Sequence, residues 1–330
     1  MSINMHKWAE SVLTSDKRPA LPIMTHPGID LIGKNVQEAV TNGETHFEAI
    51  KALQQHYPMI AATMIMDLTV EAEAFGSPIN FAPHEVPTVS DRIVSDFESV
   101  QNLNVPTLEA GRVSEYLKAA TLAAQNITNV PVFAGCIGPF SLAGRLFDMT
   151  EIMTAAYIEP ETIELLLQKC TEFINLYVKA FKKAGVGGVL IAEPAAGMLS
   201  EDMCQQFSSD YVKKIVDENQ DETFMVILHN CGNTGHVTQA MVNTSAAGLH
   251  FGNKIDITQV LNEVPANILV LGNLDPVGVF KMGTSQSVLQ ATSDLLEKTK
   301  DFRNFVISSG CDTPPGVPVE NIEAFFGAIK

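Results

Sequence analysis

The sequence of 330 residues predicts an α/β fold, a (β/α)₈ TIM barrel that forms a single domain over residues 1–330. Short apolar runs of strand character alternate with helical patterns along the chain, and this alternation favours a parallel sheet. There are eight such runs, the number that closes a barrel of this kind. Polar side chains follow the runs at the point where each run ends, as they do at the mouth of barrel enzymes. An open doubly wound sheet is the alternative that the strand pattern alone leaves open.

The predicted strands are short and are separated by helical segments. In chain order they cover residues 20–24, 61–66, 130–134, 188–192, 224–228, 247–250, 268–271 and 305–309. A helical segment is expected before the first strand. Residues 161–183 have apolar side chains at helical spacing and a Lys-rich last turn before Gly185, which is typical of a helix end. The gap from Asp67 to Val130 is too long for one crossover, so an extended excursion is expected after the second strand, around the Pro- and Gly-rich residues 69–92.

Composition narrows the classes of function. The net charge is −17 and no basic block is present, which disfavours a nucleic-acid partner because a phosphate backbone would be repelled. No apolar run approaches the ~20 residues of a membrane span, and no signal peptide is recognisable at the N-terminus. Five cysteines, an odd number in a chain of this length, argue against a disulfide framework. We therefore expect a cytoplasmic protein without membrane partners, in which grouped thiols indicate a metal site or catalysis.

The run FMVILHNC at residues 224–231 has the clearest chemical signal, because it ends in His229 and Cys231. Side chains two apart in a strand point to the same side, so this imidazole and thiol leave the strand end together. The last predicted strand leads into Gly310 and Cys311. One nitrogen and two sulfurs at one barrel mouth would form a zinc site with an open fourth position, the arrangement of catalytic zinc.

Purely structural roles are the alternative to this metal-site interpretation. A lone His-x-Cys pattern is weak, since most buried cysteines are inert small hydrophobic residues. Cys170 and Cys204 fall on apolar helical stretches and are interpreted as packing residues, and Cys136 at a strand end is a weaker candidate for chemistry. Glycine-rich phosphate loops, a GxSxG elbow and an HExxH helix are all absent from the sequence.

Several motifs resemble those of the uroporphyrinogen decarboxylase superfamily, and within it the methylcobalamin:coenzyme M methyltransferases and their bacterial relatives. The resemblance runs nearly from end to end. It is carried by AEAFG at 72–76, GPFSLAG at 138–144, HNCGNT at 229–234, GNLDP at 272–276 and SSGCDTPPGVPVENIEAF at 308–325. The HNCGNT run and the late Gly-Cys pair are typical of the methyltransferase branch.

The resemblance implies that His229, Cys231 and Cys311 bind Zn²⁺ and that a small thiol substrate, such as coenzyme M, takes the open position. The methyl group would come from methylcobalamin or another methylated corrinoid, carried by a separate corrinoid protein that docks over the barrel mouth. The charge argument agrees with this chemistry. Two thiolates already neutralise the metal, so a third thiolate from the substrate stays electron-rich and nucleophilic.

Other side chains could support the site. Glu193, at the end of the fourth predicted strand, could orient the imidazole, take the thiol proton or merely cap a helix. Asp275 and Asp67 are candidates for catalytic and cofactor-binding roles respectively, although each could be structural. Asn233 could donate to the bound cofactor or make the turn after the ligand strand, and the turn is favoured. His250 either serves as a fourth ligand or leaves that position to water.

Two other functions stay open. A uroporphyrinogen decarboxylase must bind a polycarboxylate, yet residues 24–31, where decarboxylases of the family carry arginine, contain none. A noncatalytic zinc-binding subunit of a corrinoid methyltransferase complex is the alternative from another class. Arg145 is a candidate for binding the sulfonate of coenzyme M, with an ordinary surface arginine as the plainer interpretation. A homo-oligomer is compatible with the sequence.

Overall fold

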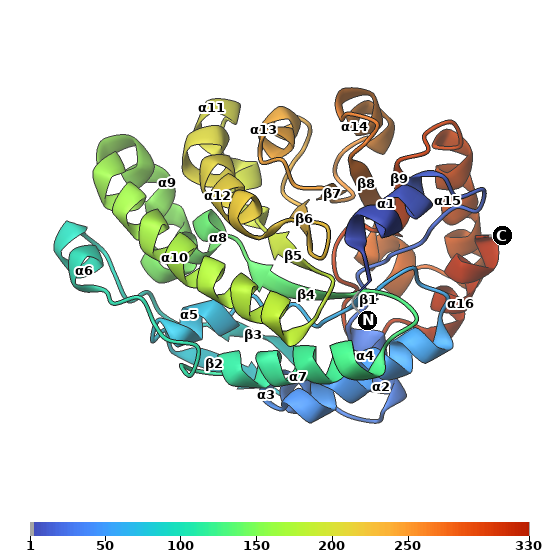
Figure 1. The fold of residues 1–330 in the computed structure, drawn as a ribbon, viewed down its shortest axis with the longest axis horizontal. Helices are drawn as coiled ribbons and strands as arrows, with labels where there is room; N and C mark the ends of the chain where they lie inside the picture. Colours follow the sequence, from blue (N-terminus) through green and yellow to red (C-terminus); the bar gives the residue numbers. More distant parts are fainter. Residues whose placement is uncertain (1–2, 330) are drawn as a thin grey trace.

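The computed structural model describes residues 3–329 and contains a strongly curved parallel sheet surrounded by helices (Figure 1). Neighbouring strands follow the order β1, β4, β5, β6, β7, β8, β9, and a two-stranded hairpin is formed by β2 and β3. The strands are β1 Ala62–Thr63, β2 Ile79–Ala82, β3 Glu85–Val89, β4 Val132–Ile137, β5 Gly188–Ala192, β6 Met225–Asn230, β7 Gly248–Phe251, β8 Leu269–Leu274 and β9 Phe305–Ser309. The sheet is therefore the wall of the predicted barrel.

Helices connect the strands and lie outside the sheet. The α-helices are α1 Met5–Leu13, α2 His26–Leu31, α3 Val36–Thr41, α4 Gly43–His56, α5 Val70–Ala74, α6 Phe97–Asn102, α7 Val113–Asn126, α8 Pro139–Phe147, α9 Met149–Ile158, α10 Pro160–Ala184, α11 Glu201–Cys204, α12 Asp210–Asn219, α13 Thr238–Asn243, α14 Ile257–Glu263, α15 Ser285–Lys298 and α16 Val319–Ala328. A 3₁₀ segment, η1 Pro194–Met198, follows β5, and π-helical segments occur at η2 Gln205–Ser209 and η3 Pro276–Lys281. None of the helices within residues 3–329 combines the length and the apolar character needed to cross a membrane.

The first predicted strand, residues 20–24, is wrong as a regular strand. Only Ala20 pairs with the sheet, in an isolated parallel bridge to Ile307 of β9. The carbonyl of Ala20 also accepts a 3.1 Å hydrogen bond from the amide of Ile60, just before β1. A regular ladder cannot form here because Pro19 and Pro22 have no N–H group to donate. This irregular segment nevertheless connects the two edge strands of the sheet and so takes the place of the eighth barrel strand.

The other seven predicted strands are present, and two of them, β5 and β9, have the predicted bounds. The largest difference is in β1, which covers only two of the six residues predicted at 61–66. The amide of Met64 still donates to Phe133 on β4, but the next amide, that of Ile65, donates to Nε2 of His46 instead. A buried side chain therefore ends the ladder of β1.

The predicted excursion after the second strand is confirmed and contains α5, the hairpin of β2 and β3, and α6. The hairpin contacts α3, whose first amide, that of Val36, donates to the carbonyl of Pro83. The predicted helix at 161–183 is α10, and it ends at Gly185, whose φ of 94° is the left-handed conformation that glycine adopts readily at a helix end.

Alternation along the strands divides the apolar side chains between two cores. On β6, Val226 and Leu228 belong to the outer core under the helices, whereas Met225 and Ile227 belong to the barrel interior. The next inward position on this strand is His229. At the other end of the barrel α1, the predicted N-terminal helix, packs against the same interior cluster. The barrel is thus filled by apolar side chains below and carries polar ones above.

Candidate metal centre

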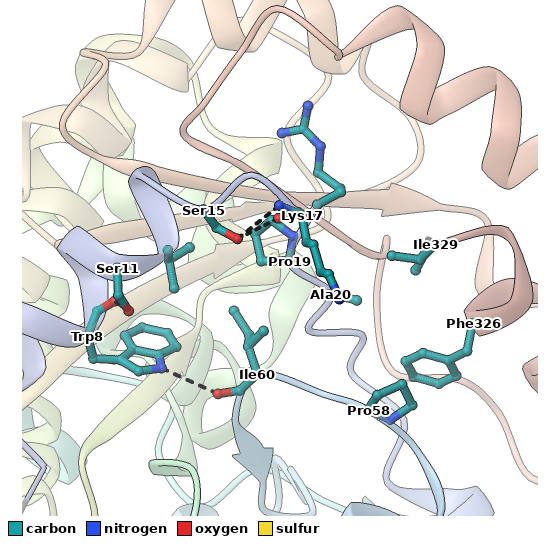
Figure 2. A pocket seen from close by; sticks show the side chains of 12 residues that line it. Trp8, Ser11, Ser15, Lys17, Pro19, Ala20, Pro58, Ile60, Phe326 and Ile329 are labelled. Atoms are coloured by element: carbon teal, nitrogen blue, oxygen red, sulfur yellow. Dashed lines mark hydrogen bonds between the residues drawn. The ribbon is translucent and has the colours of Figure 1, made fainter.

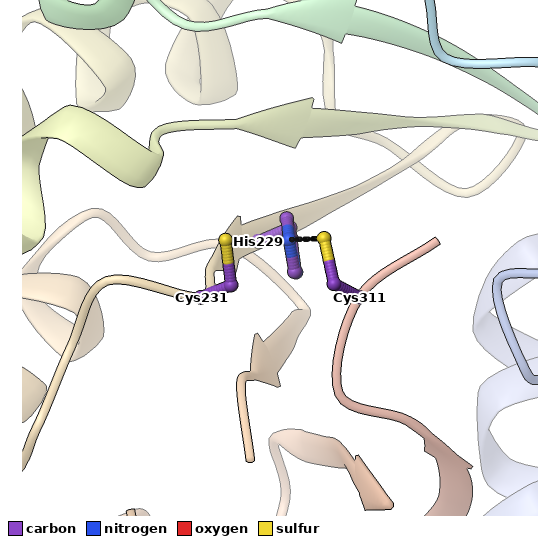
Figure 3. A group of neighbouring side chains, drawn as sticks. All are labelled: His229, Cys231 and Cys311. Carbon is purple, nitrogen blue, oxygen red and sulfur yellow. Dashed lines mark hydrogen bonds between the residues drawn. The ribbon is translucent and has the colours of Figure 1, made fainter. Parts of the chain in front are cut away.

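His229, Cys231 and Cys311 come together at the C-terminal end of the barrel (Figure 3). His229 is the next-to-last residue of β6 and is buried, and Cys231 follows the strand, while Cys311 lies two residues after β9. One ligand atom from each residue lies within 4.8 Å of the others, and Nε2 of His229 is 3.7 Å from Sγ of Cys311. In residues 3–329 this is the one group of three or more His, Cys, Asp or Glu side chains close enough to hold a metal ion.

The donor set and spacing fit zinc. In a tetrahedral site with a Zn–N bond of about 2.0 Å and a Zn–S bond of about 2.3 Å, the nitrogen and sulfur are about 3.5 Å apart. The observed distance of 3.7 Å between Nε2 of His229 and Sγ of Cys311 is close to that value. Both cysteines are partly exposed, so a ligand from solvent can reach the sulfur atoms. Three protein ligands with access from outside match a catalytic rather than a structural zinc site.

The two thiols influence each other's protonation. Interaction with the Cys311 thiol lowers the pKa of Cys231, and the same interaction together with burial raises the pKa of Cys311. Cys231 therefore releases its proton more readily than Cys311. Both must be deprotonated to bind a metal, so metal binding releases protons here.

Two glycines let the ligand loops approach each other. A Cβ atom on Gly252 would lie 2.7 Å from both Cα and the carbonyl oxygen of Cys231. A Cβ atom on Gly310, next to Cys311, would lie 2.6 Å from the backbone nitrogen of Asn253. These contacts are closer than any real Cβ tolerates, so a larger residue at either position would push a thiol-bearing loop away from the loop after β7.

Two further buried side chains continue from His229 away from the thiols. Nδ1 of His229 is 2.8 Å from Nδ1 of His250 on β7, and Nε2 of His250 is 2.8 Å from Oγ of Ser308 on β9. His250 and Ser308 each have 0% of their surface exposed. Burial lowers the pKa of His250 well below its usual value, so its imidazole is neutral. The prediction that His250 could be a fourth ligand is therefore wrong in this geometry, because both of its ring nitrogens have other partners.

Glu193 follows β5 and is fully buried, but it does not bond to the imidazole of His229. Its carboxylate accepts hydrogen bonds from the amides of Phe140 and Ser141 and from the Ser141 hydroxyl, at 2.8 to 3.0 Å. These groups are at the N-terminus of α8, where a negative charge is favourable. Burial raises the pKa of Glu193 to about 7. The geometry supports the capping alternative rather than a role in orienting the imidazole.

Asp275 and Asn233 have local structural partners. The carboxylate of Asp275 accepts from the amides of Val277 and Gly278 and caps η3. The amide side chain of Asn233 is fully buried and bonds to Gly235 and Thr238 within the turn that follows Cys231. Both groups have structural partners and neither belongs to the possible metal-ligating group, so we leave both out of the proposed site.

Asp67, after β1, is also accounted for by the fold. It forms a buried ion pair with Arg112 and accepts hydrogen bonds from the amide and hydroxyl of Thr69. Arg112 also contacts Glu73, and its guanidinium lies over the ring of Phe81 in β2. This network fixes the start of the excursion, and a cofactor-binding role for Asp67 has no support in the geometry.

The remaining cysteines match the interpretation that they are packing residues. Cys136, Cys170 and Cys204 are buried, and burial raises the pKa of each thiol, that of Cys204 to about 12. None of the three belongs to the group of side chains that is close enough to hold a metal ion within residues 3–329. These three are packing residues.

Sequence reasoning missed two contributions to the site. Ser308 sits one inward position after Val306 on β9, and only the strand alternation could have pointed to it. Asp312, directly after Cys311, accepts hydrogen bonds from the amide and hydroxyl of Thr25 and is 3.6 Å from Nδ1 of His26. That contact attaches the Cys311 loop to the irregular first segment, and it joins residues too far apart in sequence for a local pattern to reveal.

A separate pocket of about 500 Å³ opens at the opposite, N-terminal end of the barrel (Figure 2). Its walls come from α1, the irregular first segment, the approach to β1 and α16, and include Trp8, Ile60 and Phe326. Among residues 3–329, no thiol, imidazole or carboxylate lines it. This pocket is not part of the metal centre.

A sequence model described as Uroporphyrinogen decarboxylase (URO-D) matches residues 15–330. The chain belongs to the URO-D family. Two curated relatives in this family illustrate its range. Methylcobamide:CoM methyltransferase MtbA of Methanosarcina acetivorans is 29% identical over 82% of this chain and 79% of the relative. A uroporphyrinogen decarboxylase of Prochlorococcus marinus is 30% identical over 76% of this chain and 74% of the relative.

Solved structures confirm the fold expected of a URO-D family member. A methyltransferase from Methanosarcina mazei superimposes with a TM-score of 0.88 at 23% identity, covering 99% of this chain and 98% of that one. A B12-independent methionine synthase from Shewanella sp. W3-18-1 superimposes with a TM-score of 0.59 at 13% identity, covering 95% and 94% of the two chains. The predicted superfamily and the predicted barrel are both confirmed.

Proposed function

We propose that this protein is a zinc-dependent methyltransferase that moves a methyl group from a methylated corrinoid to a thiol. The coarser statement, that it is a methyltransferase enzyme, follows from its likeness to relatives of 29% and 28% identity, both named methylcobamide:CoM methyltransferase. The finer statement rests on one observation, the cluster of His229, Cys231 and Cys311 at the barrel mouth.

The ligand charges favour activation of sulfur. His229 is a neutral ligand and the two cysteines bind as thiolates, so the protein supplies two negative charges against the two positive charges of the metal. Zinc in this site would lower the pKa of a substrate thiol in the open position and so generate a thiolate at neutral pH. A substrate thiolate would carry the excess negative charge, which makes it a strong nucleophile.

The reaction balances without an oxidant or reductant. The substrate thiol releases its proton, a sulfur–carbon bond forms to the methyl group, and the cobalt–carbon bond of the methylated corrinoid breaks with its electron pair left on cobalt. The protein would hold the substrate sulfur in place until the methylated corrinoid arrives.

A corrinoid carried by a partner protein is proposed to dock at the C-terminal end of the barrel. Exposed apolar side chains on the segments that follow two strands support this. Met198 of η1, after β5, is 58% exposed, and Val277 of η3, after β8, is 51% exposed. Both lie on connections at the same end of the sheet as the metal ligands, where the apolar faces of a macrocycle would cover them.

Coenzyme M is the first thiol to test, because the relatives are named for it. Arg145 is not the exposed surface arginine that the plainer interpretation expected. It is partly buried in the last turn of α8, and burial lowers its pKa. It follows the Glu193-capped start of that helix by roughly 8 Å of helix axis.

A uroporphyrinogen decarboxylase is the second candidate, since a relative with that name is 30% identical. Its polycarboxylate substrate needs a cluster of cations at the mouth. The loop after the first segment provides Thr25 and His26, which bind Asp312, and residues 24–31 contain no arginine or lysine. The cluster of two thiols and an imidazole has no use in that reaction, so the decarboxylase is disfavoured. A noncatalytic zinc-binding subunit would share the cluster and differs only in activity.

The experiment measures bound zinc and thiol-dependent loss of methylcobalamin for the purified protein and for Cys231→Ala and Cys311→Ala. The wild type is expected to hold about one zinc per chain and to demethylate methylcobalamin only when a thiol is present. Each cysteine variant should lose most of its zinc and all methyl transfer while circular dichroism shows a folded barrel. His229→Ala should weaken zinc binding and activity without abolishing either.

Cys136→Ala is the matched control, because Cys136 is a buried strand cysteine outside the cluster, and it should keep its zinc. Zinc retained in both Cys231→Ala and Cys311→Ala would refute the ligand assignment. Zinc without turnover for any thiol tested would favour the noncatalytic subunit. Formation of coproporphyrinogen from uroporphyrinogen by a zinc-free protein would favour the decarboxylase.

A further inference from the structure

We propose that His250 and Ser308 are positioning residues that fix the tautomer and the ring orientation of His229 for metal binding. This inference rests on the proposed metal site but not on the reaction that the site performs. Its basis is the unbroken hydrogen-bonded chain from His229 on β6 through His250 on the neighbouring strand β7 to Ser308 on β9, with β8 between the last two strands.

The directions of the hydrogen bonds follow from the position of the thiols. Nε2 of His229 faces Sγ of Cys311, so this nitrogen must offer its lone pair to a metal. The ring proton of neutral His229 is then on Nδ1, which donates to Nδ1 of His250. His250 must accept there and carry its own proton on Nε2, which donates to Oγ of Ser308. Each nitrogen has one role, and the chain of donors and acceptors has no conflict.

Because the three side chains are buried, they depend on one another for hydrogen-bond partners. His229 is 2% exposed, and His250 and Ser308 are 0% exposed, so none of the three can exchange its partner for bulk water. All three occupy inward-facing positions of their strands, directly above the apolar interior of Ile227 and Val306. A buried polar chain in this place costs stability unless it is fully bonded, and the member of it that belongs to the candidate metal-ligating group of residues 3–329 is His229.

The chain also suits the charge of the site. Metal-bound histidines usually donate their second N–H to a carboxylate, a backbone carbonyl or water. A carboxylate would add a negative charge to a ligand set that already contains two thiolates. A neutral imidazole orients His229 without that added charge, and the hydroxyl of Ser308 in turn prevents the His250 ring from rotating.

The test compares His250→Phe, Ser308→Ala and His250→Gln with the wild type in zinc affinity, by chelator competition, and in the visible spectrum of the Co²⁺-substituted protein. We expect His250→Phe to bind zinc 10- to 100-fold more weakly, as is usual when the partner of a ligating histidine is lost. The cobalt d–d bands should shift while the sulfur-to-cobalt charge-transfer band stays. Ser308→Ala should weaken zinc binding less, and His250→Gln, which can still accept and donate, should recover part of the loss.

His46→Phe is the matched control. His46 is a buried imidazole that bonds to the amide of Ile65 and lies outside the metal-ligating group. It should lose thermal stability with unchanged zinc affinity and cobalt spectrum. The same pattern in His250→Phe would overturn the proposal, because it would make His250 a packing residue.

The remaining outcomes separate this inference from the proposed reaction. If His250→Phe does not fold, Ser308→Ala provides the test. A wild-type zinc affinity and cobalt spectrum in that variant would contradict the positioning role of the hydrogen-bonded chain. If these substitutions weaken zinc binding but no thiol is methylated, the positioning role is supported and the proposed reaction is refuted. A wild-type protein that binds neither zinc nor cobalt would refute both the metal centre and the positioning role of His250 and Ser308.

Discussion

Glu71 is a buried carboxyl group with an incomplete set of partners. Its Oε1 accepts from the amide of Ile137 at 3.1 Å, and Oε2 has no hydrogen-bond partner among residues 3–329. Burial raises its pKa from 4.5 to about 8. The folded protein therefore holds a proton on Glu71 at neutral pH that the unfolded chain releases.

This difference predicts the direction of a pH effect on stability. Between pH 4.5 and about 8 the folded state binds the extra proton, so the free energy of unfolding falls as the pH rises. Glu71→Gln stays neutral at every pH and should remove that loss, on the order of a few kcal/mol at pH 8. Melting temperatures at pH 5 and pH 8 measure it, with the exposed Glu172→Gln as control. An equal effect of Glu71→Gln at both pH values would contradict the assignment.

Single residues also show how much of the candidate site can be predicted from the sequence. The three candidate ligands were predicted from a two-residue spacing on one strand and from a cysteine after another. Asp275 and Glu193 were equally visible as polar residues at strand ends, but their carboxylates bond to helix N-termini. A strand-end carboxylate can serve either purpose, and only the position of the neighbouring amides distinguishes them. For His250 the sequence shows an inward polar residue without showing which nitrogen faces which partner.

At the level of elements, the loops after β6, β7 and β9 must lie in close contact for the ligands to meet. Gly252, directly after β7, touches the backbone of Cys231, where a Cβ atom would be 2.7 Å from two backbone atoms. Because backbone atoms cannot rotate away as a side chain can, an alanine must displace one of the two loops. The spacing of the ligand atoms depends on both.

We therefore predict that Gly252→Ala weakens zinc binding by about tenfold, as expected when ligand support is lost, while the fold persists. Gly327→Ala is the control, since a Cβ atom there would have no neighbour within 4 Å. Zinc titration of the two variants and their circular dichroism spectra provide the comparison. A wild-type zinc affinity in Gly252→Ala would show that the loop contact has no part in shaping the site.

The elements themselves were predictable where a strand has continuous apolar character and regular pairing. The strands β5 and β9 are fully buried and have the predicted bounds. The predictions failed where tertiary contacts or proline intervened, as at β1, where His46 captures an amide, and in the first segment, where Pro19 and Pro22 interrupt the ladder. The contact of His46 with the amide of Ile65 joins residues that are 19 positions apart, whereas the two prolines lie in or next to the segment itself.

For the whole molecule, the barrel explains why ligands from β6 and β9 meet. These strands are separated by two others in the sheet, β7 and β8, and an open flat sheet would hold them roughly 14 Å apart. Curvature brings their ends to one mouth, and the irregular first segment links both edges of the sheet. Arg18 strengthens this closure by donating to the carbonyls of Phe302, Phe305 and Thr299 near β9.

The same architecture separates stability from chemistry. Apolar side chains and α1 fill the N-terminal half of the barrel, and the inward positions above them carry His229, His250 and Ser308. Conserving the lower layers while changing the upper ones allows one barrel to serve different reactions. The alternation of inward residues could be read from the sequence, but the closure that unites the strand ends required the structure.

In the proposed reaction, a substrate thiol completes a metal centre made by His229, Cys231 and Cys311. X-ray absorption at the zinc edge tests it most directly, on the purified protein with and without coenzyme M or another thiol that supports turnover. We expect one nitrogen-type and two sulfur ligands from the protein, with a third sulfur appearing when the thiol is added. A zinc ion already held by four protein ligands, or a sulfur count that the thiol leaves unchanged, would contradict it.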